Sequence, residues 1–177
     1  MLDDSRPSKK LPSIELAILS DRVLEPLIAG SIDGASDAFG RPLPPILLED
    51  TWLWNYRLNQ LRDDPASARW LVRVVIDTDS QEIVGHAGFH GPPDENGMVE
   101  VGYTIHPTFR RRGYATAALE ALISYAASDK DAQTVRASVS PENAASLATI
   151  APFGFVQVGE QMDEIDGLEL IFERPVR

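Results

Sequence analysis

The sequence of 177 residues contains no cysteine, and this absence narrows the chemistry open to it. Disulfides, thiolate metal sites and a nucleophilic cysteine are all excluded. No apolar run approaches the ~18 residues that a membrane-spanning helix needs. The polar opening MLDDSRPSKKLP also lacks the apolar core of a signal peptide. We therefore predict a cytoplasmic protein without a membrane partner.

Basic residues are scarce: the chain has 16 Lys and Arg but 27 Asp and Glu, which gives a formal net charge of −11. Nucleic acids are bound through clustered positive charge, so this balance argues against a nucleic-acid partner. The phosphate-binding patterns G-x-x-x-x-G-K-[ST] and G-x-G-x-x-G are absent as well. Nucleotide hydrolysis and hydride transfer therefore have no support in the sequence.

Composition and length fit one globular domain. Hydrophobic residues make up 44% of the chain and charged residues 24%, which is ordinary for a soluble protein. A chain of this length can bury one core. We predict a flexible N-terminal segment over residues 1–12 and a single domain over residues 13–177.

The spacing of apolar residues predicts an α+β order of elements. Strands are predicted at 14–19, 69–76, 82–91, 98–106 and 134–140, with a final hairpin at 155–161 and 168–174. Helices are predicted after Ser20, over 48–62, after the strand 98–106, and from a Ser140–Pro141 cap to about Thr149. Residues 30–45 hold three glycines and three prolines and are predicted to be a long loop. We expect a mixed, mostly antiparallel twisted sheet of about seven strands, with about four helices and a central β-α-β crossover.

The densest positive charge lies in FRRRGYATAALEAL at residues 109–122, where three arginines and a glycine precede a helix. The first turn of a helix leaves about four backbone N–H groups unpaired, and the helix dipole adds positive charge there. An anion such as phosphate is favoured at this point, and Gly113 would let it approach the backbone closely. A solvated basic turn is the alternative. However, the dipole opposes arginine at a helix N-terminus, so three arginines together indicate a compensating anion.

The spacing of Arg110, Gly113 and Ala115 resembles the acetyl-CoA signature [QR]-x-x-G-x-[GA] of the GNAT superfamily of N-acetyltransferases. The later segment SPENAASLATIAPFGF is similar to the family's N-x-x-S pattern followed by a helix and Gly-Phe. The order of the predicted elements also matches the family fold. The resemblance implies transfer of an acetyl group from acetyl-CoA to a primary amine of a small molecule, peptide or protein, by a monomer or homodimer.

The resemblance further implies that acetyl-CoA lies in a V-shaped opening where the strands 98–106 and 134–140 separate. The backbone of Tyr103, Thr104 and Ile105 would pair with the pantetheine arm and the acetyl carbonyl. Asn143 would meet the pantetheine or position the helix that follows it. The turn would wrap the diphosphate, and the residues implied there are Arg110, Arg111, Arg112, Gly113, Tyr114, Ala115 and Thr116.

Glu100 is the candidate general base, because it lies in mid-strand in VEVGYTI and could take a proton from an ammonium acceptor. Its alternative role is a pairing partner across a solvated sheet face. Many relatives carry a tyrosine, seven residues after the asparagine, as general acid towards the thiolate; here Ile150 takes that place. Ser146 and Tyr125 are the substitutes that we consider.

The missing tyrosine makes the chain similar to many ribosomal-protein and other protein N-terminal acetyltransferases. It also leaves open a non-catalytic acyl-CoA-binding or regulatory domain on the same fold. A nucleotide-phosphate binder unrelated to coenzyme A is a third hypothesis for the arginine–glycine turn.

No motif identifies the acceptor. By resemblance, Phe39, Arg41 and Trp52 or Trp54 are candidates for the wall of the acceptor site. His90 is a further candidate for the acceptor site, because it ends the strand next to the one that carries Glu100. His86 and His90 share one strand face and could suggest a metal pair. A third ligand at recognisable spacing is missing, so we predict no metal site.

Overall fold

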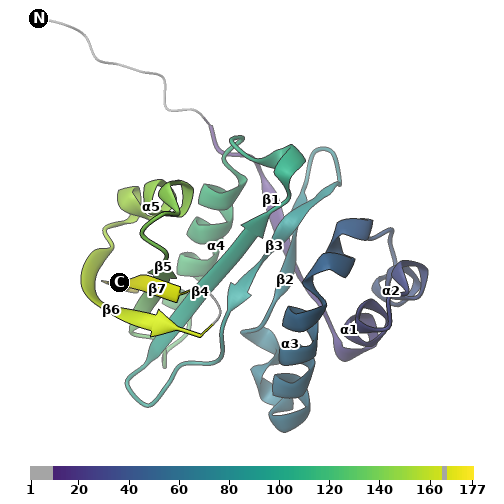
Figure 1. Ribbon diagram of the computed structural model, residues 1–177, viewed down its shortest axis with the longest axis horizontal. Coiled ribbons are helices and arrows are strands. Elements are labelled where there is room, and N and C mark those ends of the chain that lie inside the picture. Colours follow the sequence, from purple (N-terminus) through teal and green to yellow (C-terminus); the bar gives the residue numbers. More distant parts are fainter. Residues whose placement is uncertain (1–9, 165–166) are drawn as a thin grey trace, which may run out of the picture.

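The computed structural model describes residues 10–164 and 167–177, so most of the segment predicted to be flexible, residues 1–9, lies outside the described residues. Seven strands form one sheet in the order β1-β2-β3-β4-β5-β7-β6 (Figure 1). Among the strand pairs of the described residues, β4 and β5 are parallel and all the others are antiparallel. The strands are β1 (Ile14–Ile18), β2 (Arg73–Asp77), β3 (Ile83–Phe89), β4 (Met98–Ile105), β5 (Thr134–Val139), β6 (Val156–Asp163) and β7 (Gly167–Pro175).

Helices cover both faces of the sheet. The helices α1, α2 and α3 lie together beside β1–β3, whereas α4 lies on the opposite face and forms the crossover from β4 to β5 (Figure 1). The α-helices are α1 (Asp21–Ile28), α2 (Ile32–Phe39), α3 (Thr51–Asp63), α4 (Tyr114–Ser128) and α5 (Ala144–Ile150). The 3-10 helices are η1 (Pro45–Asp50), η2 (Pro65–Arg69), η3 (Pro107–Phe109) and η4 (Ala151–Phe153). The predicted α+β fold with its central crossover is confirmed.

Two hydrophobic cores result, one on each face of the sheet. Strand β2 is buried throughout, and its side chains alternate between the two sides. Val74 and Ile76 belong to the core that α1 and α3 complete, which also contains the fully buried Trp54. Val75 belongs to the other core, together with Leu119 of α4. Because α1–α3 lie over β1–β3 only, the same face of β4 and β5 is left for the site described below.

The prediction of a long loop over 30–45 is wrong, because α2 occupies its middle. The Ser31 side chain caps this helix by accepting a hydrogen bond from the Gly34 N–H, at 3.1 Å. Gly40 ends the helix in the left-handed conformation, with φ of +83°. The glycines at 30 and 40 therefore flank the helix, and the prolines follow it. Ala35 is buried against the core, which supplies the tertiary contact that a short helix needs.

Two predicted boundaries are also corrected. The strand predicted from residue 69 begins at Arg73, because Asp64 caps a 3-10 turn that runs to Arg69. The helix predicted from Ser140 begins at Ala144, and its cap is Asn143. The Asn143 side chain accepts a hydrogen bond from the Ser146 N–H, at 3.0 Å.

Candidate active site

The parallel ladder between β4 and β5 ends early. Its last pair joins Glu100 to Arg136, although β4 continues to Ile105 and β5 to Val139. The strands therefore separate after Glu100, at the place where the family resemblance implies a V-shaped opening. This separation leaves one edge of β4 unpaired next to the N-terminus of α5.

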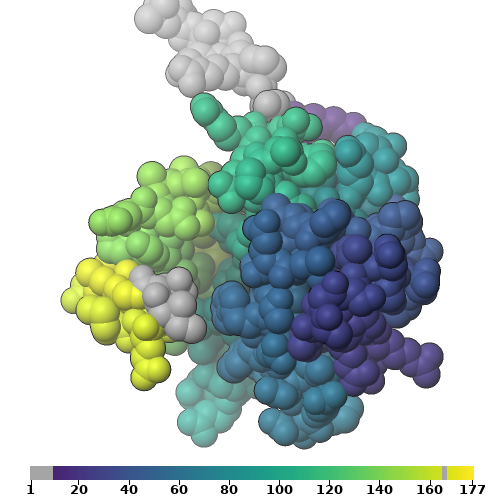
Figure 2. Space-filling view, turned by 45° about the vertical axis from the view of Figure 1, so that its right-hand side comes forward, coloured from purple at the N-terminus to yellow at the C-terminus, as the bar shows by residue number. Residues whose placement is uncertain are grey.

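A cleft of about 880 Å³ lies at this separation. Figure 2 shows the hollow between the α3 region, in blue, and the region of α5 and the β6–β7 hairpin, in green and yellow. Helix α3 contributes Trp52, Tyr56 and Arg57 to the wall, and the hairpin contributes Asp163 and Glu169. Residues of β3, β4, β5 and the first turn of α5 complete the lining.

The backbone of β4 faces the cleft at every second residue. The Glu100 carbonyl accepts a hydrogen bond from the His90 N–H, and the His106 N–H donates to Val84, so the even-numbered residues bond towards β3. The odd-numbered ones, Tyr103 and Ile105 among them, point their N–H and C=O groups towards the opening. The prediction that the Thr104 backbone pairs with the pantetheine arm is corrected, because this backbone is paired with His86 of β3. The Thr104 side chain is the part left for the cleft.

The turn after β4 ends in an α4 N-terminus of the predicted kind. Gly113 is the cap residue, in the left-handed conformation with φ of +93°, and Arg111 before it also has a positive φ of +63°. Within the described chain, the backbone N–H groups from Gly113 to Thr116 donate to no other residue. This set of free donors at a helix N-terminus can hold an anion.

The three arginines of the turn are all exposed. Arg110 donates from Nε to the Ile105 carbonyl, at 3.0 Å, so part of its guanidinium closes the turn. Arg112 lies over the Phe109 ring, at 5.5 Å from its centroid. None of the three forms an ion pair with an acid in the part of the chain that the structure describes. Their charge is left for a ligand.

Tyr114 has a structural side chain. Its hydroxyl is buried and donates to Asp77 Oδ2, at 2.6 Å. This hydrogen bond, together with burial, raises the pKa of Tyr114 to about 12. The side chain therefore ties α4 to β2, and only the Tyr114 backbone remains for a ligand.

Glu100 lies one layer behind the cleft surface. Its side chain is 18% exposed, and its Oε1 accepts a hydrogen bond from the Ser138 hydroxyl, at 2.6 Å. His90 Nδ1 lies 3.6 Å from the same oxygen. Ser138 and His90 both line the cleft, so these two groups connect the carboxylate to it. Ser138 has no signal in the sequence, because the register of β5 against β4 decides which residue faces Glu100.

His90 is held by its backbone and by its neighbours. Its carbonyl accepts hydrogen bonds from Arg57 and Gln60 of α3. Half of its side chain is exposed, yet the ring lies in a concave wall. Desolvation there lowers the pKa of His90; the Glu100 charge acts in the opposite direction, and Arg57 adds to the lowering. His90 is therefore suited to receive a proton rather than to hold one at neutral pH.

The first turns of α5 form the other side of the opening. Asn143 and Ser146 line the cleft, and the Asn143 side chain is engaged as the helix cap. Ile150 is buried in the core. Tyr125 is partly buried and packs edge-to-face on Trp70, with 5.3 Å between the ring centroids, against the core that α4 completes. Tyr125 is therefore no longer a candidate for the general acid. Ser146 remains a candidate, because it lines the cleft.

Of the four candidates for the acceptor wall, Trp52 lines the cleft and the other three lie elsewhere. Trp52 lines the cleft and is 60% exposed. Trp54 is buried and donates its indole N–H to the Leu47 carbonyl. Phe39 is wrongly predicted, because α2 carries it against the core of α1–α3. Arg41 likewise donates to Gln81, away from the cleft.

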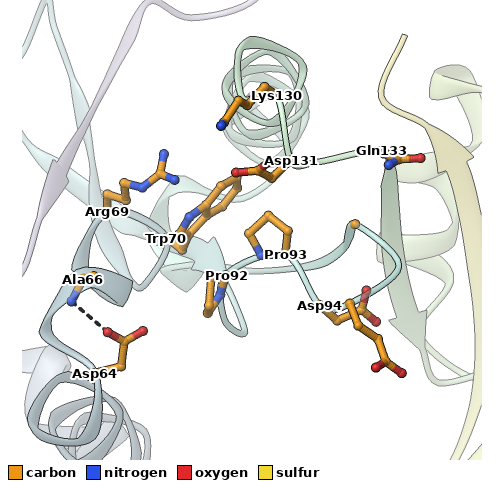
Figure 3. A pocket seen from close by; sticks show the side chains of 12 residues that line it. Asp64, Ala66, Arg69, Trp70, Pro92, Pro93, Asp94, Lys130, Asp131 and Gln133 are labelled. Atoms are coloured by element: carbon orange, nitrogen blue, oxygen red, sulfur yellow. Dashed lines mark hydrogen bonds between the residues drawn. The ribbon is translucent and has the colours of Figure 1, made fainter.

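A second cavity of about 540 Å³ lies where β3 ends and β4 and β5 begin, at the opposite end of β4 from Gly113. Figure 3 shows Trp70, Pro92 and Pro93 among its lining side chains, with Asp64 bonded to Ala66. Asp94 accepts from the N–H groups of its own loop. The carboxylates of Asp64 and Asp94 therefore hold the loops beside this cavity in place.

Two further findings concern residues 10–164 and 167–177. No three His, Cys, Asp or Glu side chains gather there in a way that could hold a metal ion. Across the same residues, every helix is too short or too polar to cross a membrane.

The comparisons with known proteins agree with this geometry. A family model described as an acetyltransferase (GNAT) domain matches residues 32–156. The chain belongs to the GNAT acetyltransferase family. The uncharacterized N-acetyltransferase YjdG of Bacillus subtilis (strain 168) is 37% identical over 83 residues, which make up 47% of this chain and 49% of that protein. The GNAT chain thus spans about half the length of the curated relatives it matches.

Solved structures show the same fold. A GNAT-family acetyltransferase from Bacillus anthracis has a TM-score of 0.62 and 19% identity, covering 94% of this chain and 97% of that one. The microcin C7 self-immunity acetyltransferase MccE, in complex with acetyl-CoA and AMP, has a TM-score of 0.64 and 18% identity over 92% of both chains. The GNAT fold is therefore shared along nearly the whole length of this protein.

Proposed function

We propose that this GNAT protein transfers an acetyl group from acetyl-CoA to a primary amine by direct attack in a ternary complex. The observation that carries the proposal is the separation of β4 and β5 next to a helix N-terminus with free N–H groups and unpaired arginines. The diphosphate would lie at Gly113–Thr116, and the pantetheine along the free edge of β4. MccE, of the same fold, is solved with acetyl-CoA.

Direct attack needs the thioester and the amine held together, and the cleft continues from the β4 edge to the α3 wall. Backbone N–H groups of the free β4 edge can stabilise the oxyanion. Asp163 and Glu169 of the hairpin and the exposed rings of Trp52 and Tyr56 line the far side. Carboxylates and ring faces favour an acceptor that arrives as an ammonium ion.

The ammonium must lose a proton before it attacks. We assign this proton to the pair of His90 and Glu100, with His90 at the cleft surface and Glu100 behind it. Ser138 holds the carboxylate oxygen in place. On the leaving-group side, Ser146 is the hydroxyl at the cleft wall. The acceptor's identity, a cytoplasmic location and a monomeric or dimeric state stay predictions.

A thiol-release assay tests the proposal. Purified protein is incubated with acetyl-CoA and with single amines, polyamines or peptides with free N-termini, and released coenzyme A thiol is measured. We expect thiol release that depends on the amine and matches acetylated product mole for mole. Tight acetyl-CoA binding without turnover on any amine would instead support the non-catalytic acyl-CoA-binding alternative.

Gly102→Ala tests the position of His90. A Cβ at residue 102 would lie 2.8 Å from His90 Nε2, so the ring must turn away from its place near Glu100. We expect turnover to fall about tenfold, because a displaced proton acceptor costs rate without affecting the cofactor site. The acetyl-CoA Kd should not change. Gly91→Ala is the matched control, since its Cβ would meet nothing within 4 Å. Equal rates for the two variants would remove His90 from the mechanism.

A further inference from the structure

Helix α5, beside which the proposed reaction would release the thiol, has the sequence AASLATI and carries no acidic side chain. Ser146 lies at the wall, but an alcohol is a far weaker acid than a thiol. A thiolate therefore cannot take the Ser146 proton unless another group replaces that proton at once. Phenols, with a pKa of about 10, are much closer to thiols, at about 8.5. A tyrosine next to Ser146 would supply the missing acid.

Tyr103 meets this requirement. Its backbone faces the β4–β5 opening, and its side chain lies at the cleft between the core of α4 and the first turns of α5. The hydroxyl is shielded from solvent and has no well-formed hydrogen bond within the described residues. Such an orphaned polar group in a native protein calls for an explanation.

Two hydroxyl groups that can pass protons, those of Ser146 and Thr149, lie near the Tyr103 hydroxyl. Burial raises the pKa of Tyr103, whereas the nearby Ser146 and Thr149 hydroxyls lower it. The phenol is thus protonated at neutral pH. The Thr149 hydroxyl itself donates to the Ala145 carbonyl, at 2.9 Å, so Ser146 is the hydroxyl free to pass a proton between Tyr103 and the cleft.

We propose that Tyr103 is a proton-relay residue for the leaving thiolate and acts through Ser146; this rests on the proposed acetyl transfer. When the tetrahedral intermediate collapses, the C–S bond breaks and its electron pair goes to sulfur. The Ser146 proton moves to sulfur, and the Tyr103 proton moves to the Ser146 oxygen. The tyrosinate then regains a proton from water in the cleft through the Ser146 hydroxyl. Of the two protons that the ammonium loses, one thus balances the new S–H bond and the other enters solvent.

The test compares Tyr103→Phe, Ser146→Ala and the double variant on two donors, acetyl-CoA and its selenium analogue. The selenol leaves as a stable anion without a proton. We expect Tyr103→Phe to lose about 10²-fold in turnover with acetyl-CoA, to bind acetyl-CoA as the unchanged protein does, and to recover most of the loss on the selenoester. The double variant should be no slower than Ser146→Ala, because both residues serve one step.

Tyr125→Phe is the control, because it removes a phenol from the core without touching the cleft. Full turnover by Tyr103→Phe, or an equal loss on thioester and selenoester, would overturn the proposal. Should Tyr103→Phe not fold, Ser146→Ala alone must still show the selenoester recovery, and its failure to do so is equally decisive. These outcomes require that the unchanged protein acetylates an amine, so a failure of the relay is distinct from a failure of the proposed function.

Discussion

Replacement of Glu100 by Gln is expected to lower turnover about 10²–10³-fold while the acetyl-CoA Kd stays unchanged. The change keeps the shape of the side chain and removes its negative charge. In the proposed mechanism, this charge supports His90 when the histidine takes the proton of the acceptor. Ser138 can still donate to the amide oxygen, so the local geometry is retained. The measurement combines steady-state rates of thiol release with calorimetry of acetyl-CoA binding.

The pH profile of this variant gives a second result. His90 must be neutral to accept a proton, so the rate should fall as the pH drops through the pKa of His90. The Glu100 charge raises that pKa, and its removal should lower it. The acid limb of the rate profile is therefore expected to move to lower pH in Glu100→Gln.

Glu120→Gln provides the control, because it removes one exposed carboxylate from α4 on the other face of the sheet. Its rate and its pH profile should match those of the unchanged protein. A Glu100→Gln variant with full activity would show that the carboxylate only anchors Ser138 and that His90 or water takes the proton without it.

Most of the fold could be predicted from local patterns. Alternating apolar residues identified the strands, and the small-residue helix after Gly113 identified the crossover. The helix α2 was missed because glycines and prolines were counted without regard to position: Ser31 and Gly40 are capping residues of a helix, not breakers. Its stability comes from packing on α1, a contact that no local pattern records.

The parts of the candidate site that depend on local backbone structure could be predicted from the sequence. The turn at Arg110–Gly113 and the charged residue in mid-strand could be read from residue types. Ser138 and the Tyr103 hydroxyl could not, because each depends on how the separated strands and α5 lie against one another. Phe39 failed for the same reason, since the direction of a side chain on an unrecognised helix has no signal in the sequence.

Gly113→Val should weaken acetyl-CoA binding by about 5–150-fold, corresponding to roughly 1–3 kcal/mol of backbone strain. Gly113 has a φ of +93°, which a β-branched residue rarely adopts, and its Cβ would lie 3.2 Å from Pro12 and 3.3 Å from Leu11. The chain must therefore leave the left-handed conformation, and the free N–H groups of the first α4 turn change direction.

The reason differs from the one that the sequence alone suggests. A side chain at 113 would meet the segment of Leu11 and Pro12 instead of filling the space assigned to the diphosphate. The expected loss thus arises from the cost of restoring the turn each time that the cofactor binds. Calorimetry should show the loss for coenzyme A and for acetyl-CoA alike, because both carry the diphosphate.

Gly40→Val separates this effect from general destabilisation. Gly40 has a similar φ of +83°, and a Cβ there would meet nothing within 4 Å. Its position at the end of α2 is remote from the arginine turn, so the variant should lose thermal stability but keep its acetyl-CoA Kd. If Gly113→Val folds and binds acetyl-CoA as tightly as Gly40→Val does, the N–H groups of this turn do not hold the diphosphate, because a displaced set of donors could not bind it equally well.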